Sequence, residues 1–279
     1  MERTFVGNLK ALWRYPVKSM QGETLEACEV VERGLLGDRT HALWDVKTKR
    51  VASAKNPKKW AALLDCRATF AKAPQAGEQM PPVHIELPVG ATVTSTQADI
   101  NPLLSNWAER EVQFLSSVPE APSLDQYWPD VEGREHRDTV LELFMPEGTF
   151  FDSCPIHAIT VATLERLKEL YPAGDFEPCR FRPNLLIDTQ AAQASFVEND
   201  WVGQVLMIGD SVALKIDTAC PRCVVTTLAQ EGLPQDLDIL RTTAQHNNVI
   251  AGVRLSVMQG GTIRQGDSVW IESADQLEN

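Results

Sequence analysis

Residues 205–216, with the sequence VLMIGDSVALKI, contain the pattern that decides the fold class of this chain. Two apolar runs flank the turn-forming pair Gly209 and Asp210, an arrangement that predicts a β-hairpin. Other short β-favouring runs, separated by turn-forming residues, lie at 9–15, 25–31, 40–46, 66–70, 156–161, 184–187, 224–228 and 253–258. Short strands with frequent turn signals are typical of barrels and sandwiches. The sequence therefore predicts a mainly β protein with a few helices, of the α+β class.

Two segments break the β pattern. Residues 99–109 place apolar side chains at helical spacing, with Asp99 as the expected N-cap and Pro102 in the first turn. Residues 163–171 also predict a helix, which Pro172 ends. Between the two helices, residues 117–133 are rich in proline and acidic side chains, a composition typical of a linker. We therefore expect two domains, over residues 1–117 and 118–273.

The net charge excludes several classes of partner. The chain of 279 residues carries 26 Lys and Arg against 38 Asp and Glu, a formal net charge of −12. Broad nucleic-acid binding and docking on anionic lipid both need a surplus of cations, so neither is expected. No run approaches the roughly 18 apolar residues of a membrane span. We expect a cytoplasmic protein with no membrane span and no nucleic-acid partner, although one basic pocket can exist on an acidic protein.

The sharpest local motif is Cys220-Pro221-Arg222-Cys223. Its spacing fits a redox dithiol, half of a zinc site, or two unrelated buried cysteines. A redox dithiol is expected before a helix, whereas the β-branched run 224–227 follows here, and no second C-x-x-C motif completes a zinc site. The three interpretations stay open. Arg222 favours a neighbouring thiolate, which is the form that attacks substrates or binds a soft metal.

Two further segments supply cations. Arg180-Phe181-Arg182-Pro183-Asn184 precedes an apolar strand, and in an extended chain its two arginines would point to one side. Arginine forks suit phosphate or carboxylate, but solvated charges at the start of a strand are the simpler interpretation. Tyr15-Pro16-Val17-Lys18-Ser19, followed by Gly37-Asp38-Arg39, offers a cation and a hydroxyl for an anion. The five histidines form no metal-ligand spacing, and we expect them in the core or on the surface.

In this order along the chain, the motifs resemble those of MOSC proteins. Residues 15–19 and 37–39 resemble the N-terminal β-barrel signature of that family, whereas 181–184, 220–227 and 261–267 resemble the MOSC domain itself. The resemblance is to the branch that contains the mitochondrial amidoxime reducing component and its bacterial relatives. It implies an N-terminal β-barrel-like domain over 1–117 and a MOSC β-barrel domain over 118–273.

The resemblance also implies a cofactor, molybdenum with molybdopterin. In that branch the second cysteine of the C-x-x-C motif binds the metal, which makes Cys223 the expected metal ligand and catalytic residue. The residues expected to bind the cofactor are Lys18, Ser19, Arg39, Ser153, Cys154, Arg182, Asn184 and Arg222. Ser153-Cys154-Pro155 departs from the family pattern, which often has two small hydroxyl residues before the proline. Cys154 therefore either replaces a hydroxyl or lies near the metal.

The implied function is that of an oxidoreductase that reduces N-hydroxylated or N-oxide-type small molecules. No further cysteine set follows Cys223, so we expect a separate electron donor, either a ferredoxin, a cytochrome b5-like protein or a flavin reductase. One alternative is a carrier that holds the cofactor, or holds sulfur as a Cys223 persulfide, without turning over substrate. Another is a redox dithiol protein. Under the first hypothesis, Lys18, Arg39, Arg182 and Arg222 converge into one basic pocket near Cys223.

Overall fold

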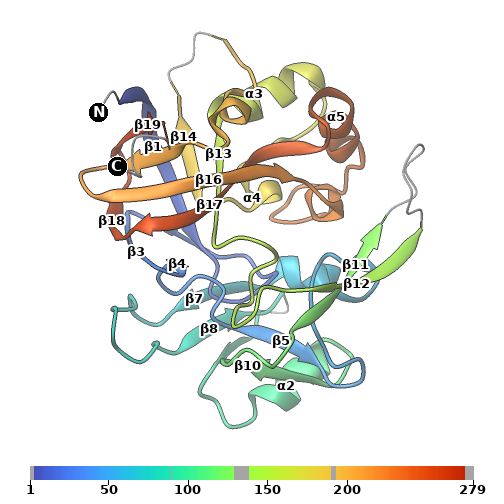
Figure 1. Cartoon of the computed structure of the whole chain (residues 1–279). Coiled ribbons are helices and arrows are strands. Elements are labelled where there is room, and N and C mark those ends of the chain that lie inside the picture. Colours follow the sequence, from blue (N-terminus) through green and yellow to red (C-terminus); the bar gives the residue numbers. More distant parts are fainter. Residues whose placement is uncertain (1–2, 89, 129–137, 190–192, 274–279) are drawn as a thin grey trace.

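Strands dominate the structure, as the short apolar runs predict, and the mainly β class with a few helices is confirmed. The computed structural model describes residues 3–88, 90–128, 138–189 and 193–273. A strand barrel fills the upper half in Figure 1, and smaller sheets make up the lower half. None of the helices in this described part has both the length and the apolar content needed to span a membrane.

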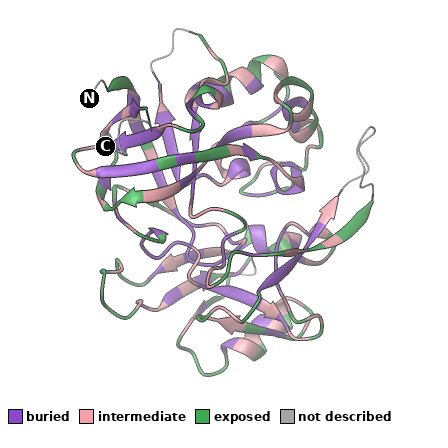
Figure 2. Cartoon of the chain, viewed as in Figure 1, coloured by how far each residue is buried: buried purple, intermediate pink, exposed green. Residues whose placement is uncertain are grey.

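Seven strands close into the barrel. Their order is β1, β14, β13, β17, β16, β15 and β19, and β19 pairs with β1 again. The closure buries a core of leucine, isoleucine and valine side chains, among them Leu12, Ile187 and Leu214, so these strands are largely buried in Figure 2. The bounds are β1 (Thr4–Arg14), β13 (Ile156–Thr160), β14 (Leu185–Asp188), β15 (Val205–Ile208), β16 (Val212–Pro221), β17 (Ile250–Gln259) and β19 (Ser268–Glu272), with β2 (Glu23–Leu25) on the end of β1.

The first strand, β1, closes the barrel because it pairs with three partners in turn. Its start pairs with β19, its middle with β14 and its end with β2, and a bulge shifts the register within each of the first two pairings. Gly7 lies in the first shift, where a Cβ atom would come within 2.0 Å of the carbonyl oxygen of Asp188. A side chain at this position would therefore push β1 away from β14.

The lower half contains two sheets and a helix around a second apolar core. A five-stranded sheet has the order β10-β5-β6-β11-β12, and a three-stranded sheet has the order β7-β8-β9. The bounds are β5 (Ala42–Asp45), β6 (Arg50–Val51), β7 (Arg67–Phe70), β8 (Val83–Glu86), β9 (Thr92–Thr94), β10 (Val112–Leu115), β11 (Ser123–Trp128) and β12 (Thr139–Phe144). A further small sheet, β18 (Gly261–Arg264), β3 (Ala27–Val31) and β4 (Gly34–Leu35), pairs strands from near the two ends of the chain and packs on the barrel core.

The strand pairing crosses the predicted domain boundary in both directions. Strand β1 comes from the first residues of the chain but belongs to the barrel, whereas β11 and β12 follow residue 117 but complete the lower sheet. The interpretation of 117–133 as a linker is wrong for Ser123–Trp128, which is strand β11, whereas 117–122 forms no helix or strand. Residues 129–133 lie outside the described residues. The division at 117 and 118 itself stays a prediction.

The predicted hairpin and both predicted helices are present. Strands β15 and β16 pair across Gly209 and Asp210. Helix α2 (Ile100–Trp107) begins after Asp99, but the Asp99 side chain makes no capping hydrogen bond. Helix α3 (Val161–Leu170) is capped by Thr160, whose hydroxyl accepts the backbone N–H of Thr163 at 3.1 Å. The remaining helical segments are α1 (Pro57–Trp60), η1 (Ala61–Asp65), α4 (Pro178–Phe181), η2 (Val197–Trp201), η3 (Val224–Thr227) and α5 (Asp238–Asn247).

Candidate functional site

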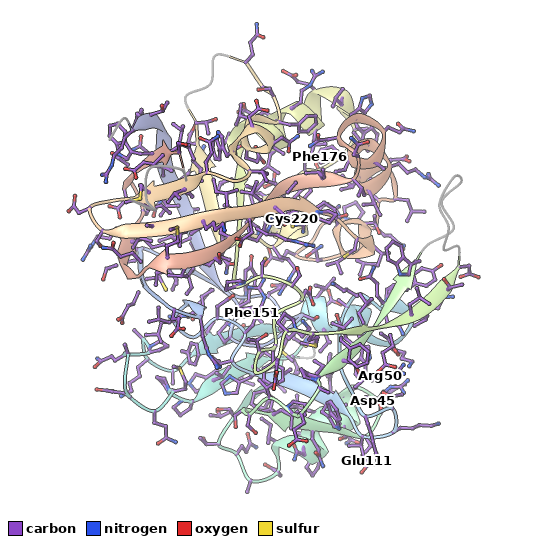
Figure 3. All side chains as sticks on the ribbon, in the orientation of Figure 1. Asp45, Arg50, Glu111, Phe151, Phe176 and Cys220 are labelled. Atoms are coloured by element: carbon purple, nitrogen blue, oxygen red, sulfur yellow. The ribbon has the colours of Figure 1, made fainter. Side chains whose placement is uncertain are left out.

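A cavity lies where the barrel meets the lower half. Figure 3 labels Cys220 on the barrel and Phe151 at this junction. All nine residues that the sequence analysis expects to bind the cofactor or the metal line this one cavity: Lys18, Ser19, Arg39, Ser153, Cys154, Arg182, Asn184, Arg222 and Cys223. The predicted convergence of the cations near Cys223 is therefore present in the structure. The roles of these residues in cofactor binding stay predictions.

The loop that follows β1 holds Lys18 and Ser19 against the loop of Arg39. The backbone N–H of Lys18 donates to the carbonyl of His41 at 2.9 Å, and the backbone N–H of Arg39 donates to the carbonyl of Tyr15 at 2.7 Å. Ser19 has a φ of 65° and Arg39 a φ of 49°, so both bends use the left-handed region. The hydroxyl of Ser19 accepts the backbone N–H of Ala54 at 3.1 Å, which fixes its position in the wall.

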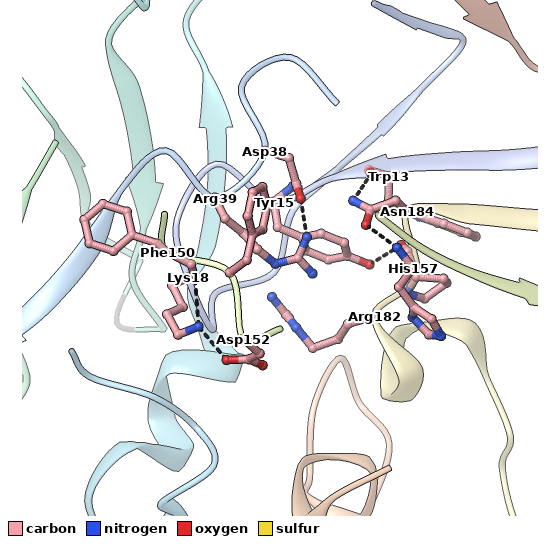
Figure 4. Close-up of polar contacts among 12 residues, drawn as sticks. Trp13, Tyr15, Lys18, Asp38, Arg39, Phe150, Asp152, His157, Arg182 and Asn184 are labelled. Atoms are coloured by element: carbon pink, nitrogen blue, oxygen red, sulfur yellow. Dashed lines mark hydrogen bonds and ion pairs between the residues drawn. The ribbon is translucent and has the colours of Figure 1, made fainter. Parts of the chain in front are cut away.

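Lys18 is paired with a carboxylate that the motifs do not predict. Its ammonium lies 2.5 Å from Oδ1 of Asp152 and 2.8 Å from the carbonyl of Phe150 (Figure 4), and Lys55 approaches Oδ2 of Asp152 at 3.4 Å. Burial lowers the pKa of Lys18 to about 8, an effect that Asp152 partly offsets. The cavity disfavours the Asp152 charge, but the two lysines outweigh this and hold its pKa well below the usual range.

Two guanidinium groups stack on the ring of Tyr15. The Cζ atom of Arg39 lies 4.7 Å from the ring centroid, and the Cζ atom of Arg182 lies 4.4 Å from it. The Tyr15 hydroxyl donates to the carbonyl of Pro183 at 2.9 Å, and its backbone N–H donates to Asp38 at 2.7 Å. Asp38 also forms an ion pair with Arg39. Tyr15 thus joins the two cationic loops, which Figure 4 shows side by side.

Arg182 reaches the cavity by a different route from the one predicted. The extended chain expected over 180–184 is wrong, because Pro178–Phe181 is helical and Arg182 has a φ of 52°. The turn separates the two arginines. Arg180 is fully buried and donates to the carbonyls of Asp175, Thr226, Leu228 and Pro234. Arg182 donates to the carbonyl of Met20 at 2.7 Å, so neither arginine is the solvated charge of the simpler interpretation.

Asn184 uses its side chain to connect strands. Its Oδ1 accepts the backbone N–H of His157 at 3.1 Å, and its Nδ2 donates to the carbonyl of Trp13 at 3.3 Å. The residue is buried, so these bonds fix the barrel wall at the point where the cavity begins. Its contribution to the cavity is thus first of all to position its neighbours.

The thiols occupy the barrel end of the cavity. Arg222 donates to Sγ of Cys220 at 3.1 Å and to the carbonyl of Phe181 at 2.6 Å, and lies 3.3 Å from Nε2 of His157. Burial opposes ionisation of Cys220, but His157, Arg222 and Arg254 outweigh it and lower the pKa of this thiol to about 5. Burial raises the pKa of the Cys154 thiol to about 11. Cys220 is therefore the thiolate and Cys154 the neutral thiol.

Cys223 begins a turn where the sequence predicts a strand. The expectation for 224–228 is wrong, because Val224–Thr227 forms η3. The Thr226 hydroxyl donates to the carbonyl of Cys223 at 3.0 Å, and the Thr227 hydroxyl donates to the carbonyl of Val224 at 2.7 Å. Such local side-chain bonds compete with strand pairing. The turn sets the thiol of Cys223 at the cavity wall.

Sequence reasoning missed several residues of the wall. Lys55, Asp152, His157 and Arg254 line the cavity but belong to no motif that we singled out. His157 is buried, as expected of a core histidine, yet its ring also contacts Arg222 and the thiol of Cys220. Asp152 could have been found from the sequence, because it directly precedes the expected cofactor-binding segment Ser153-Cys154-Pro155. Arg254 and Lys55 offered no such signal, because nothing local distinguishes them from other cations.

Two family models match the chain in the order of its motifs. The model described as MOSC N-terminal beta barrel domain matches residues 6–101, and the model described as MOSC domain matches residues 146–270. The chain is a MOSC domain protein.

Several relatives are similar to this MOSC protein over nearly its whole length. Mitochondrial amidoxime-reducing component 1 of Mus musculus is 25% identical over 298 residues, which covers 95% of the MOSC protein and 82% of the relative. Mitochondrial amidoxime reducing component 2 of Homo sapiens is 26% identical over 293 residues, with 95% and 83% covered. The crystal structure of the YUAD protein from Bacillus subtilis aligns over 98% of both chains, with a TM-score of 0.49 and 11% identity.

The cavity of this MOSC protein fits an anionic, sulfur-bound metal cofactor. Two buried guanidinium nitrogens at the cavity, Nε of Arg222 and Nε of Arg254, lack a hydrogen-bond partner among the described residues. Such orphan donors call for an acceptor from a ligand. The soft thiol of Cys223 suits a metal that prefers sulfur. Within the described ranges, no group of three or more His, Cys, Asp or Glu side chains could hold a metal ion by itself.

Proposed function

We propose that this MOSC protein binds molybdenum with molybdopterin and reduces N-hydroxylated or N-oxide-type small molecules. The observation that carries the proposal is the convergence of nine motif residues, from both halves of the fold, on one cationic cavity that contains thiols. The names of the similar proteins, which are amidoxime-reducing components, support the same reaction class.

Different residues of the cavity contact different parts of the cofactor in this proposal. Lys18, Arg39, Arg182 and Arg222 present cations to the anionic groups of the cofactor, since arginine forks and a lysine ammonium suit phosphate oxygens. Cys223 supplies a thiolate ligand to the metal. Tyr15 keeps Arg39 and Arg182 in place, and Asp152 does the same for Lys18 and Lys55. A cation that contacts within the protein hold in place loses less conformational freedom when it binds a ligand.

The net reaction of an N-hydroxylated substrate is R–NH–OH + 2 e⁻ + 2 H⁺ → R–NH₂ + H₂O. When bound, the cofactor supplies the two-electron redox chemistry at the metal. The electrons come from a separate donor, either a ferredoxin, a cytochrome b5-like protein or a flavin reductase. The Lys18 ammonium, with a pKa of about 8, keeps its proton at neutral pH and so holds positive charge in the cavity wall.

All six cysteines are free, which suits the reducing cytoplasm that we propose as the site of activity.

The second candidate is a carrier that holds the cofactor, or holds sulfur as a Cys223 persulfide. The feature that favours it is the presence of three thiols in one cavity, those of Cys154, Cys220 and Cys223, with the pKa of Cys220 lowered to about 5. A thiolate beside a second thiol suits sulfur transfer as well as metal binding.

The experiment compares Cys223→Ser with Cys179→Ser, a matched cysteine that lies outside this cavity. The proteins are produced in a host that makes the cofactor, and molybdenum and pterin are measured by elemental analysis and mass spectrometry. We expect about one molybdenum per chain in the wild type and in Cys179→Ser, and at least a 100-fold loss of amidoxime reduction in Cys223→Ser. Wild-type protein without molybdenum or pterin would overturn the proposal. Cyanide-releasable sulfur on Cys223, with cofactor bound but no turnover by any donor, would favour the carrier.

A further inference from the structure

Arg254 is, with Lys55, one of two cations on the described wall of the cavity that belong to none of the sequence motifs. Strand β17 carries it, opposite His157 of β13 and Thr218 of β16. The residue lines the cavity, and its buried Nε has no hydrogen-bond partner among the described residues. A buried donor without an acceptor is costly, so its presence points to a ligand that supplies an oxygen.

The other cations of the cavity each have an acceptor in the protein. Lys18 and Lys55 share Asp152, and Arg39 pairs with Asp38. Arg182 donates to the carbonyl of Met20. Nε of Arg222 is also unpartnered in the described part of the chain, but its other two nitrogens donate to Sγ of Cys220 and to the carbonyl of Phe181. Among the described residues, the cavity wall has one carboxylate, that of Asp152. The cations of the wall outnumber it and are Lys18, Arg39, Lys55, Arg182, Arg222 and Arg254. A surplus of positive charge in a concave site attracts anions even on a protein with a net charge of −12.

The position of Arg254 separates it from the cations around Tyr15. Lys18, Arg39 and Arg182 gather near Tyr15 and Asp152 in Figure 4. Arg254 instead lies beside His157, which contacts Arg222 at 3.3 Å, and so belongs to the thiol end of the cavity. Cys223, the expected metal ligand, lines the same cavity as Arg254, and the charges of both act on Lys55. A substrate whose reacting group reaches the metal therefore enters the cavity that Arg254 lines.

We propose that Arg254 binds an anionic oxygen group of the substrate, a carboxylate, and so selects N-hydroxylated compounds that carry a negative charge. This inference rests on the proposed reductase function. The guanidinium fork matches a carboxylate in geometry as well as charge, so lysine at this position would keep only part of the selectivity.

The test measures selectivity with two substrates that differ by one carboxylate, benzamidoxime and 4-carboxybenzamidoxime. Wild-type protein with its cofactor is expected to favour 4-carboxybenzamidoxime in kcat/KM. In Arg254→Gln this ratio falls at least tenfold, mainly through a higher KM, and Arg254→Lys recovers part of it. Arg264→Gln is the matched control, because Arg264 is exposed and lies outside the cavity. An equal loss of kcat/KM for both substrates would show a structural role for Arg254. A shifted pH profile for benzamidoxime would show a role through Cys220. Either result would overturn the proposal.

Two further readouts do not depend on turnover. Molybdenum and pterin contents are measured for each variant, and a fall in Arg254→Gln alone would mean that Arg254 binds the cofactor phosphate instead, which overturns the proposal. Calorimetric titration with benzoate, with benzamide as the neutral probe, reports binding directly. One outcome is that the wild-type protein binds benzoate, that Arg254→Gln does not, and that the wild type still reduces no amidoxime. That result supports the anion subsite and overturns the proposed function. Wild-type protein that reduces benzamidoxime but has no preference for the carboxylate overturns only this inference.

Discussion

The ammonium of Lys18 lies 2.5 Å from Oδ1 of Asp152, although the two residues are 134 positions apart in the sequence. Lys55 lies 3.4 Å from the other oxygen of the same carboxylate. One acid from the segment between β12 and β13 thus pairs with two cations from the first 55 residues of the chain. This ion pair fixes one wall of the cavity.

Asp152→Asn should lower the pKa of Lys18 below its value of about 8, because the carboxylate is what offsets the effect of burial. The ammonium would then lose its proton at a lower pH. Nuclear magnetic resonance of ¹³C-methylated lysines in cofactor-free protein measures this titration. Asp138→Asn removes the exposed partner of Lys58 and should leave the Lys18 titration unchanged. An unchanged or higher Lys18 pKa in Asp152→Asn would contradict the ion pair.

The Cys220 thiol should ionise with a midpoint near pH 5, since His157, Arg222 and Arg254 stabilise its thiolate against burial. Thiolate absorbance at 240 nm follows this ionisation without requiring access for a reagent. The step should disappear in Cys220→Ser and remain in Cys66→Ser, because burial raises the pKa of Cys66 to about 12. A step that survives in Cys220→Ser would assign the thiolate to another cysteine.

The same thiolate should make stability depend on pH. Between pH 5 and the ordinary thiol pKa of 9.0, the folded state binds fewer protons at Cys220 than the unfolded state. The free energy of unfolding contributed by Cys220 therefore rises with pH across this window and is lost as the pH falls towards 5. Urea denaturation of wild type and Cys220→Ser at pH 5.5 and 8 measures the difference, which should be larger at pH 8. Equal differences at the two pH values would rule out this linkage.

Gly252→Ala should destabilise the fold far more than Gly232→Ala. Both glycines have positive φ angles, 88° and 80°, so both substitutions carry the same backbone strain. A Cβ at Gly252 would lie 2.3 Å from Nε2 of His157 and 2.5 Å from the carbonyl oxygen of Ala158, whereas a Cβ at Gly232 meets nothing within 4 Å. We expect about 1 kcal/mol for Gly232→Ala and at least about 2 kcal/mol more for Gly252→Ala in urea denaturation. Equal values would mean that β17 does not pack on His157 this closely.

Arg180→Met should cost about 4 kcal/mol of unfolding free energy, because it leaves four carbonyls without their donor, two of them in fully buried hydrogen bonds. Two of these carbonyls, of Thr226 and Leu228, belong to the turn after Cys223. Arg241→Ala removes an exposed ion pair with Asp238 and should cost under about 0.5 kcal/mol. Urea denaturation distinguishes the two variants, and a cost for Arg180→Met as small as that for Arg241→Ala would refute the structural role of Arg180.

The sequence by itself determined the parts that depend on neighbouring residues. The hairpin of β15 and β16 follows from apolar runs around Gly209 and Asp210, and α2 follows from apolar spacing, because both patterns are local. The ordered motifs also indicated the family and the nine residues of the cavity, from Lys18 to Cys223. Local patterns carry this information because each motif requires its own backbone conformation.

Only the tertiary structure decided what lies between the motifs. Strand β1 closes the barrel through pairings with β14 and β19, and these span almost the whole chain. The β-branched run 224–227 becomes a turn, because its own threonine hydroxyls and Arg180 satisfy its carbonyls. Asp152 and Arg254 enter the cavity through long-range packing. The interaction energy of two charges depends on their distance in space. Residues far apart in the sequence can lie a few ångströms apart in the fold, so the sequence alone does not give this distance.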